Sequence, residues 1–201
     1  MLSFINRLSF ALFSLSALPV CASSFSYNFV ELGYADQKND VLSSAADQNG
    51  YDIHGSYEFH PSFFAQAYYT DQDGEQTIAQ QSIDFKNRQW SLGAGWHTTL
   101  NTKSDVFVIY SYENNSVSFA HANLSKVDRD INAIEAGVRF KPITTIEVFA
   151  SLSYLDADGS ENDTGYKLGS QFSLADNVHL GLSYGERFNS EYSRVFLQVS
   201  F

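Results

Sequence analysis

The side chains of this sequence that could carry acid-base or metal chemistry are a few histidines and many carboxylates. No two histidines have the H-x-x-x-H spacing that holds a metal ion on one helix face, and no G-x-S-x-G nucleophile elbow occurs. His121, with Asp128 and Asp130 nearby in the sequence, is the best candidate for a hydrolase or acyl-transfer site. Because spacing alone does not bring these groups together, we expect no enzyme, no cofactor and no metal site. The histidines are His54, His60, His97, His121 and His179.

Carboxylates gather in three segments that lie between apolar stretches. Such oxygen-rich clusters can bind Ca²⁺ or bridge through divalent ions to lipopolysaccharide. The last cluster lacks the spacing of an EF-hand loop, because Gly159 stands at its fourth position rather than the sixth. The simpler interpretation, which we adopt, is a solvated acidic surface. The three clusters are Asp36, Asp40 and Asp47; Asp71, Asp73 and Glu75; and Asp156, Asp158, Glu161 and Asp163.

The start of the sequence predicts a secretory signal peptide. Arg7 precedes an apolar run from Leu8 to Val20, which is too short to span a bilayer easily. The residues Val20-Cys21-Ala22 suit a signal peptidase, so we expect residues 1–22 to be removed and residues 23–201 to form one domain. A lipoprotein signal ending at Cys21 is the alternative, disfavoured by the bulk of Val20. Cleavage would remove the one cysteine and exclude disulfides.

The composition of the 201 residues narrows the class of protein further. With 12 basic and 23 acidic residues the formal net charge is −11, which argues against a nucleic-acid partner. Aromatic residues are abundant, with 12 Tyr and 17 Phe, and no later stretch is apolar enough for a transmembrane helix. The choice therefore lies between a soluble all-β domain and a membrane barrel.

Period-2 alternation of apolar and polar residues recurs along the chain and predicts β-strands. In residues 51–59, Tyr51, Ile53 and Tyr57 share one face, whereas Asp52 and His54 share the other. The hairpin around residues 71–87 has the weakest pattern, and an eight-stranded barrel is the alternative to ten strands. The ten predicted strands are residues 25–34, 51–59, 63–71, 88–98, 104–114, 130–140, 144–155, 165–174, 178–187 and 192–201.

Connection length and aromatic placement favour the membrane barrel. Short turns at 60–62, 99–103, 141–143 and 175–177 alternate with longer connections at 35–50, 72–87, 115–129 and 156–164, before a short last loop near Asn189. Tyrosines fall at the long-loop ends of the apolar faces, and Phe or Trp at the short-turn ends, as in two membrane-interface girdles. We therefore predict an all-β, up-and-down antiparallel transmembrane barrel with short periplasmic turns and longer extracellular loops. The girdle residues are Tyr34, Tyr51, Tyr69, Tyr112, Tyr154, Tyr166 and Tyr184, and Phe59, Phe63, Trp96, Phe140, Phe172 and Phe201.

The polar strand faces must then point into the barrel. Ten strands leave at most a narrow interior, and buried charges need partners, so we expect a lumen plugged by ion pairs. Arg139 is predicted to lie diagonal to Glu147, across a turn formed by residues 141–143. A selective path for small solutes is the alternative. The predicted inward set is Glu31, Asp52, His54, Glu58, Gln66, His97, Glu113, Glu135, Arg139, Glu147, Lys167, Gln171 and Arg194.

The end of the chain carries a family resemblance. Val195, Leu197, Val199 and Phe201 alternate with polar residues up to a terminal Phe, which is similar to the signal read by the outer-membrane barrel-assembly machinery. With Glu135-Ala-Gly-Val-Arg-Phe-Lys-Pro142, this resembles the small single-domain outer-membrane barrels of the OmpA and OmpX class. The resemblance implies a Gram-negative outer membrane, contact with lipid and lipopolysaccharide, a monomer, and a structural or surface-interaction role. A narrow porin-like channel and an enzyme at the barrel rim remain alternatives.

Overall fold

The computed structural model describes residues 25–39, 46–78, 81–120, 126–158 and 162–201, and these form an all-β structure. The predicted signal peptide, residues 1–22, lies outside the described residues. No helix in the described part of the chain is long and apolar enough to cross a membrane. The strands are β1 (Phe29–Asn39), β2 (Ala46–His60), β3 (Phe63–Ile78), β4 (Gln81–Asn101), β5 (Ser104–Phe119), β6 (Val127–Ile143), β7 (Ile146–Ala157), β8 (Asp163–Ala175), β9 (Val178–Arg187) and β10 (Ser190–Ser200).

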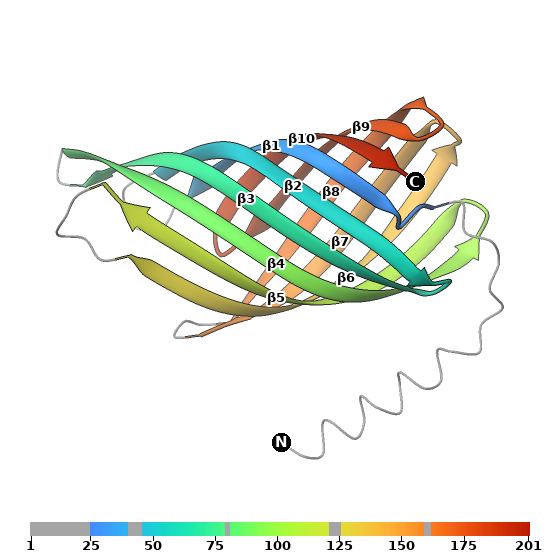
Figure 1. Cartoon of the computed structure of the whole chain (residues 1–201), viewed down its shortest axis with the longest axis horizontal. Helices are drawn as coiled ribbons and strands as arrows, with labels where there is room; N and C mark the ends of the chain where they lie inside the picture. Colours follow the sequence, from blue (N-terminus) through green and yellow to red (C-terminus); the bar gives the residue numbers. More distant parts are fainter. Residues whose placement is uncertain (1–24, 40–45, 79–80, 121–125, 159–161) are drawn as a thin grey trace, which may run out of the picture.

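The ten strands close into one barrel. Each strand pairs antiparallel with its neighbour in the sequence, and β1 pairs with β10 along its whole length, from Phe29 to Asn39 (Figure 1). The prediction of an up-and-down barrel is therefore confirmed, with ten strands rather than eight. An even strand number brings the start of β1 and the end of β10 to the same rim, which we call the turn end; the opposite rim is the loop end.

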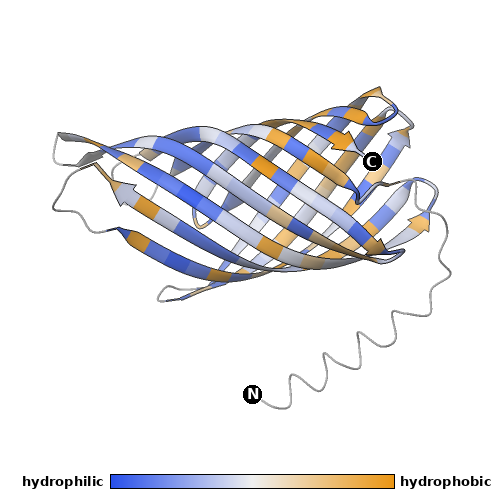
Figure 2. Ribbon diagram, viewed as in Figure 1, coloured by the Kyte–Doolittle hydropathy of each residue, from blue (hydrophilic) through white to orange (hydrophobic). Residues whose placement is uncertain are grey.

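Alternation along each strand gives the wall two chemically different faces. On β2 the side chain of Ile53 points outward, 45% exposed, whereas its neighbour Asp52 points inward, 4% exposed. The apolar residues thus face outward and the polar residues inward, which is the reverse of a water-soluble barrel and suits a hydrocarbon surrounding. Figure 2 shows the result as apolar patches alternating with polar ones along the ribbons.

Two-residue turns connect the strands at the turn end. They are residues 61–62, 102–103, 144–145 and 176–177. The predicted turn at residues 141–143 is wrong, because β6 continues to Ile143 and the chain reverses at Thr144 and Thr145. Pro142 lacks an amide N–H, yet it is accommodated because the pairing of β6 with β7 is irregular between Phe140 and Ile143.

The predicted long loops are mostly strand in the structure. β3 runs on to Ile78 and pairs with β4 from Gln81, so the segment expected to be a loop at residues 72–87 is a hairpin. β1, β2, β5 and β6 are likewise longer at the loop end than expected. The outward positions of the extensions are polar, as at Asp71, Asp73 and Lys86, so the apolar outward face used for prediction is absent although the backbone still pairs. Asp40, His121 and Glu161 lie outside the described residues.

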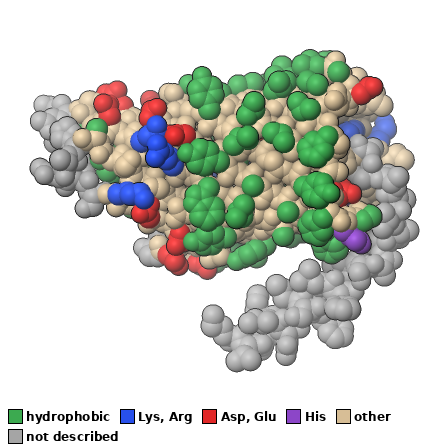
Figure 3. Space-filling model, viewed as in Figure 1, with side chains coloured by type: hydrophobic (Ala, Val, Ile, Leu, Met, Phe, Trp, Pro, Cys, Tyr) green, Lys and Arg blue, Asp and Glu red, His purple; other side chains and the backbone are tan. Residues whose placement is uncertain are grey.

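The outward face carries the two aromatic girdles. Tyr51 and Tyr154 at the loop end are 74% and 47% exposed, and Phe59 and Phe201 at the turn end are 59% and 72% exposed. Figure 3 shows hydrophobic side chains spread over the middle of the wall, with most charged side chains in this view gathered where β3 and β4 project. The apolar band is therefore bounded by polar surface at the loop end.

Inward-facing rings lie over glycines of the neighbouring strand. Phe64 on β3 is paired directly with Gly95 on β4, and a Cβ added at Gly95 would overlap the Phe64 ring. These glycines leave room for the large rings that fill the narrow interior. The same relation holds for Phe85 and Gly74, Phe107 and Gly137, Phe149 and Gly169, Phe196 and Gly181, and Tyr192 and Gly185.

Candidate functional site

The interior of the barrel is where titratable side chains converge, and it is the candidate site. Period-2 alternation directs charged side chains and histidines inward from nine of the ten strands, β3 being the exception. The structure brings each charged residue and histidine of the predicted inward set within 4 Å of an opposite partner, if the histidines are counted as cations. Gln66 lies 3.3 Å from His54 Nε2, and Gln171 is buried on the inward face of β8.

Arg194 on β10 is the centre of the first group. Its Nη2 lies 2.5 Å from Asp52 Oδ1 on β2, and its Nη1 lies 2.8 Å from Glu31 Oε2 on β1. Glu31 Oε2 is also 3.4 Å from His54 Nδ1. One guanidinium therefore offsets two buried carboxylates across the junction at which the barrel closes, which is the kind of planar, several-pronged contact that arginine makes best.

The second group of ion pairs links strands β5, β6, β8 and β9. Lys167 Nζ on β8 lies 2.7 Å from Glu135 Oε1 on β6. Arg187 Nη2 on β9 reaches both oxygens of Glu113 on β5, at 2.9 and 3.1 Å, which spans the interior between strands that are not neighbours. Gln89 donates a further hydrogen bond to Glu113 at 2.8 Å. These contacts cross-link opposite parts of the barrel.

The third group lies at the turn end. Arg139 Nε lies 2.5 Å from Glu147 Oε1, and Lys141 Nζ lies 3.6 Å from Glu147 Oε2. His97 stands between two carboxylates, with Nε2 3.3 Å from Glu58 and Nδ1 3.3 Å from Asp105. His97 and Asp105 are almost wholly inaccessible, at 1% and 0% of their side-chain surface.

The diagonal relation of Arg139 to Glu147 arises in a different register from the predicted one. Arg139 is directly opposite Phe149, and Gly137 is opposite Ser151 rather than Glu147 as expected. The turn at residues 144–145 shifts the pairing by four residues. Glu147 thus remains a diagonal neighbour of Arg139, but it lies on the turn side of Phe149.

Among the described residues, the interior charges that were not predicted include Asp105, Lys141 and Arg187. Asp105 shares its inward face with Phe107 and Ile109, so that part of β5 reads as apolar. Lys141 falls in the segment expected to be a turn. Arg187 is the last residue of β9, where strand alternation is hardest to read. For Asp105, its parity with Glu113 on the same strand is the signal that could have revealed it.

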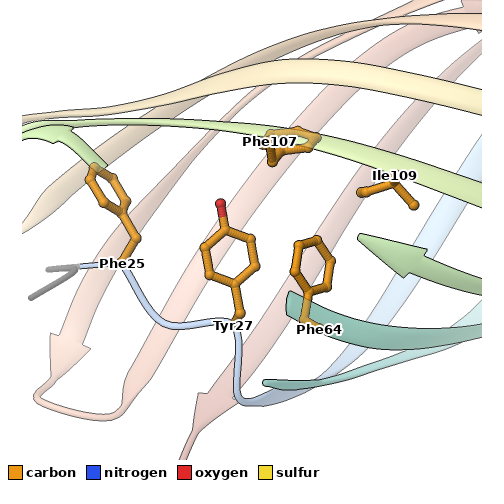
Figure 4. Close-up of a cluster of buried hydrophobic side chains, with 5 residues drawn as sticks. All are labelled: Phe25, Tyr27, Phe64, Phe107 and Ile109. Carbon is orange, nitrogen blue, oxygen red and sulfur yellow. The ribbon is translucent and has the colours of Figure 1, made fainter. Parts of the chain in front are cut away.

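A short segment before β1 lies inside the turn end. The predicted strand at residues 25–34 is wrong at its start, because β1 begins at Phe29 and residues 25–28 turn into the barrel. Phe25 and Tyr27 are 3% and 4% exposed and pack in one cluster with Phe64, Phe107 and Ile109 (Figure 4). Burying two rings inside the barrel removes more apolar surface from water than extending the edge of β1 into solvent would.

A second apolar cluster lies inside the loop end. It consists of Ile131, Ala133, Leu155 and Ala157 from β6 and β7, with Phe188 packed against it. Phe188 and Asn189 have φ of 51° and 54° and form the two-residue turn between β9 and β10, as a type I′ hairpin requires. The Arg129 guanidinium lies 5.5 Å from the centre of the Phe188 ring. Apolar groups therefore occupy both ends of a charged interior.

The described residues do not establish a geometry for the suggested enzyme site at the barrel rim. Its histidine, His121, lies outside them. Asp128 is 2.9 Å from Lys126 Nζ, and hydrogen bonds from Lys126 and Ser116 hold the pKa of Asp128 below its ordinary value. Asp130 accepts a hydrogen bond from Asn114 at 2.7 Å. Both carboxylates are thus engaged with local partners.

One further serine–histidine contact occurs among the described residues. Ser173 Oγ lies 2.9 Å from His179 Nδ1 on the adjacent strand, but no carboxylate within the described part of the chain lies within hydrogen-bonding distance of His179. This contact therefore lacks the third member that orients a catalytic histidine. The described residues contain no group of three or more His, Cys, Asp or Glu that could hold a metal ion.

The closed antiparallel wall, its apolar outer face and its charged interior define a transmembrane β-barrel. The chain belongs to the outer membrane protein beta-barrel domain family, which it matches over residues 8–194. Family membership places it in the outer membrane as a multi-pass barrel. No protein with a curated description matches the sequence.

Solved structures share this fold at low sequence identity. The translocator domain of autotransporter NalP from Neisseria meningitidis is 10% identical, with a TM-score of 0.52 over 98% of this chain and 94% of that chain. Neisserial surface protein A (NspA) is 13% identical, with a TM-score of 0.50 over 88% and 98% of the two chains. The NanC porin is 8% identical, with a TM-score of 0.50 over 86% and 98%. At these identities the likeness concerns the architecture alone.

Proposed function

We propose that this protein is a non-conducting outer-membrane barrel with a structural and surface-interaction role, and that it is not an enzyme. The observation that carries this proposal is the way the interior is filled. Its charges are arranged in opposite pairs, and apolar clusters occupy both ends. An ion entering this interior would have to separate pairs that offset one another, in a barrel much narrower than those that enclose water-filled channels.

The projecting hairpin of β3 and β4 supports the surface role. Its outward face carries Asp71, Asp73, Lys86 and Arg88 beyond the aromatic girdle, with Lys86 Nζ 3.1 Å from Asp71 and Arg88 Nε 3.2 Å from Asp71. Hydrogen-bonded strands hold these charges in a fixed pattern above the membrane, where lipopolysaccharide or another surface would meet them. The remaining expectations belong to the same proposal: a signal peptide cleaved after Ala22, delivery by the barrel-assembly machinery, and a monomer.

Planar-bilayer recording on the purified, refolded barrel tests the closed interior. We expect no stepwise current at moderate voltage, and we expect the matched variant Arg194→Ala to remain closed because the other two groups still fill the interior. Reproducible unitary currents from the wild-type protein would contradict the proposal. Control recordings with detergent alone and with a known porin set the two limits of the measurement.

A narrow solute channel is the second candidate, because two interior cations are accessible to water. The side chains of Lys167 and Arg187 are 35% and 30% exposed although both point into the barrel. If they line a path, wild-type currents should select for anions, and Lys167→Gln should reduce that selectivity. Bilayer recording in a salt gradient gives the reversal potential that distinguishes this candidate from a closed barrel.

A further inference from the structure

We propose that the turn-end mouth of the barrel is a binding site for a peptide with aromatic side chains at alternate positions. In the structure the chain's own residues 25–28 occupy this site as a tethered ligand. The inference goes beyond the proposed function, because it concerns a ligand that can be separated from the wall rather than the permeability of the barrel.

The wall of the mouth forms an aromatic receptacle for the ring of Tyr27. That ring stacks on the imidazole of His97, with 3.9 Å between ring centres and an angle of 22° between the planes. It also lies 4.5 Å from the ring centre of Phe64. Phe64, Phe107 and Ile109 of β3 and β5 complete the apolar surroundings (Figure 4). The flat rings of His97 and Phe64 against it select for an aromatic side chain.

Two cations add a second element of recognition. The Arg139 guanidinium lies 5.2 Å from the ring centre of Phe25 and 4.8 Å from that of Tyr27, and Lys141 Nζ lies 4.8 Å from the Phe25 ring. Arg139 Nη1 also donates a 3.0 Å hydrogen bond to the carbonyl of Ser26, between the two rings. The wall thus contacts the ring of Phe25, the carbonyl of Ser26 and the ring of Tyr27, so it recognises two rings that are separated by one residue.

The occupant is separate from the wall that binds it. The pairing of β1 with both β2 and β10 begins at Phe29, so the barrel closes without residues 25–27. Asn28 forms the junction: its side chain accepts a 2.7 Å hydrogen bond from the Glu58 amide, and its carbonyl accepts one from the Phe201 amide at 3.1 Å. Removing the rings of the segment should therefore empty the site and leave all ten strands in place.

Peptide binding to an emptied site tests this proposal. In the full-length variant Phe25→Ser with Tyr27→Ser, a fluorescent peptide of sequence Ser-Phe-Ser-Tyr-Asn should bind saturably, as measured by anisotropy in detergent. The wild-type barrel, whose site is filled, should bind it at least tenfold more weakly. A peptide of the same composition with adjacent rings, Ser-Ser-Phe-Tyr-Asn, controls for partition into micelles. Adding Arg139→Met with Glu147→Gln to the emptied variant should weaken binding at least tenfold.

Heat-modifiable migration on gels checks that each variant is folded. Equal binding by wild type and variant, equal binding of the two peptides, or no binding to a folded variant would each overturn the proposal. If the double variant does not fold, Tyr27→Ser alone serves for the same titration. Failure of both to fold would show the segment to be part of the wall and would also overturn the proposal. No readout depends on current, so this result stands apart from that of the conductance test.

Discussion

Arg139 is held at once by a carboxylate, two aromatic rings and a backbone carbonyl. Glu147 binds its Nε, its guanidinium lies over the rings of Phe25 and Tyr27, and Ser26 accepts from its Nη1. Guanidinium is suited to this position because it stays charged and can stack on rings while donating within its own plane. Lysine could replace the charge but not this combination of contacts.

The variant Arg139→Ala should lower the free energy of unfolding, because it leaves a buried carboxylate without its main partner. The loss expected for one member of a buried pair is about 3 to 5 kcal/mol, and Lys141, 3.6 Å from Glu147, should bring it towards the lower end. The matched variant Arg139→Met with Glu147→Gln removes both charges and should cost less. Urea unfolding in lipid vesicles measures both. An Arg139→Ala barrel as stable as wild type, or less affected than the double variant, would contradict this account.

The direction of these side chains could be predicted from the sequence, but their partners could not. Strand alternation is a local property, so the faces of Glu135, Arg139 and Glu147 follow from the spacing of their neighbours. Pairing depends on register, which the position of the turn sets. Arg187 and Glu113 lie on strands far apart in the barrel order, so no local pattern could connect them.

Individual strands differ in what their sequences disclose. The membrane part of β3 alternates clearly from Phe63 to Tyr69 and could be predicted, whereas its extension to Ile78 could not. Beyond the girdle, polar side chains are tolerated on both faces, so the hydrophobic pattern no longer marks a strand. At the start of β1 the failure has the opposite cause, because Phe25 and Tyr27 continue the alternation although the backbone has left the wall.

The last strand, β10, should decide how much protein assembles. Val195, Leu197, Val199 and Phe201 all face outward and are at least 42% exposed, which leaves them available during assembly. Replacing Phe201 with Asp should lower the folded fraction in cells, because a charge then stands at the membrane interface and the terminal ring is lost. Heat-modifiable migration of membrane extracts measures the folded fraction.

Phe201→Leu is the matched control for this variant, since it keeps an apolar end and should lose less folded protein. An unchanged folded yield in Phe201→Asp would refute the role given to this residue. If Phe201→Asp also refolds normally from urea into detergent, the defect lies in assembly in the cell. A matching loss in detergent would instead assign the effect to the stability of the wall.

At the scale of the whole molecule, ten strands, closure and the inside-out distribution of polarity all follow from repeated alternation and turn spacing. The apolar clusters inside the two ends of the barrel do not follow from these patterns. The cluster at the turn end joins Phe25 to Phe107, and the one at the loop end joins Leu155 to Phe188. Both unite residues that are distant in the sequence, so only the folded barrel brings them together.

The junction of β1 with β10 allows the chain to be circularly permuted. β1 pairs with β10 over the same residues, Phe29 to Asn39, as it pairs with β2, and the Phe201 amide binds the Asn28 carbonyl. The start of β1 and the end of β10 therefore meet at an ordinary strand junction. A circular permutant that joins Phe201 to residue 25 through a flexible linker and opens between Asp176 and Asn177 should refold in detergent to a heat-modifiable barrel. A permutant that stays unfolded while the linker-bearing, unpermuted control folds would show that chain order, and not only the closed wall, determines this structure.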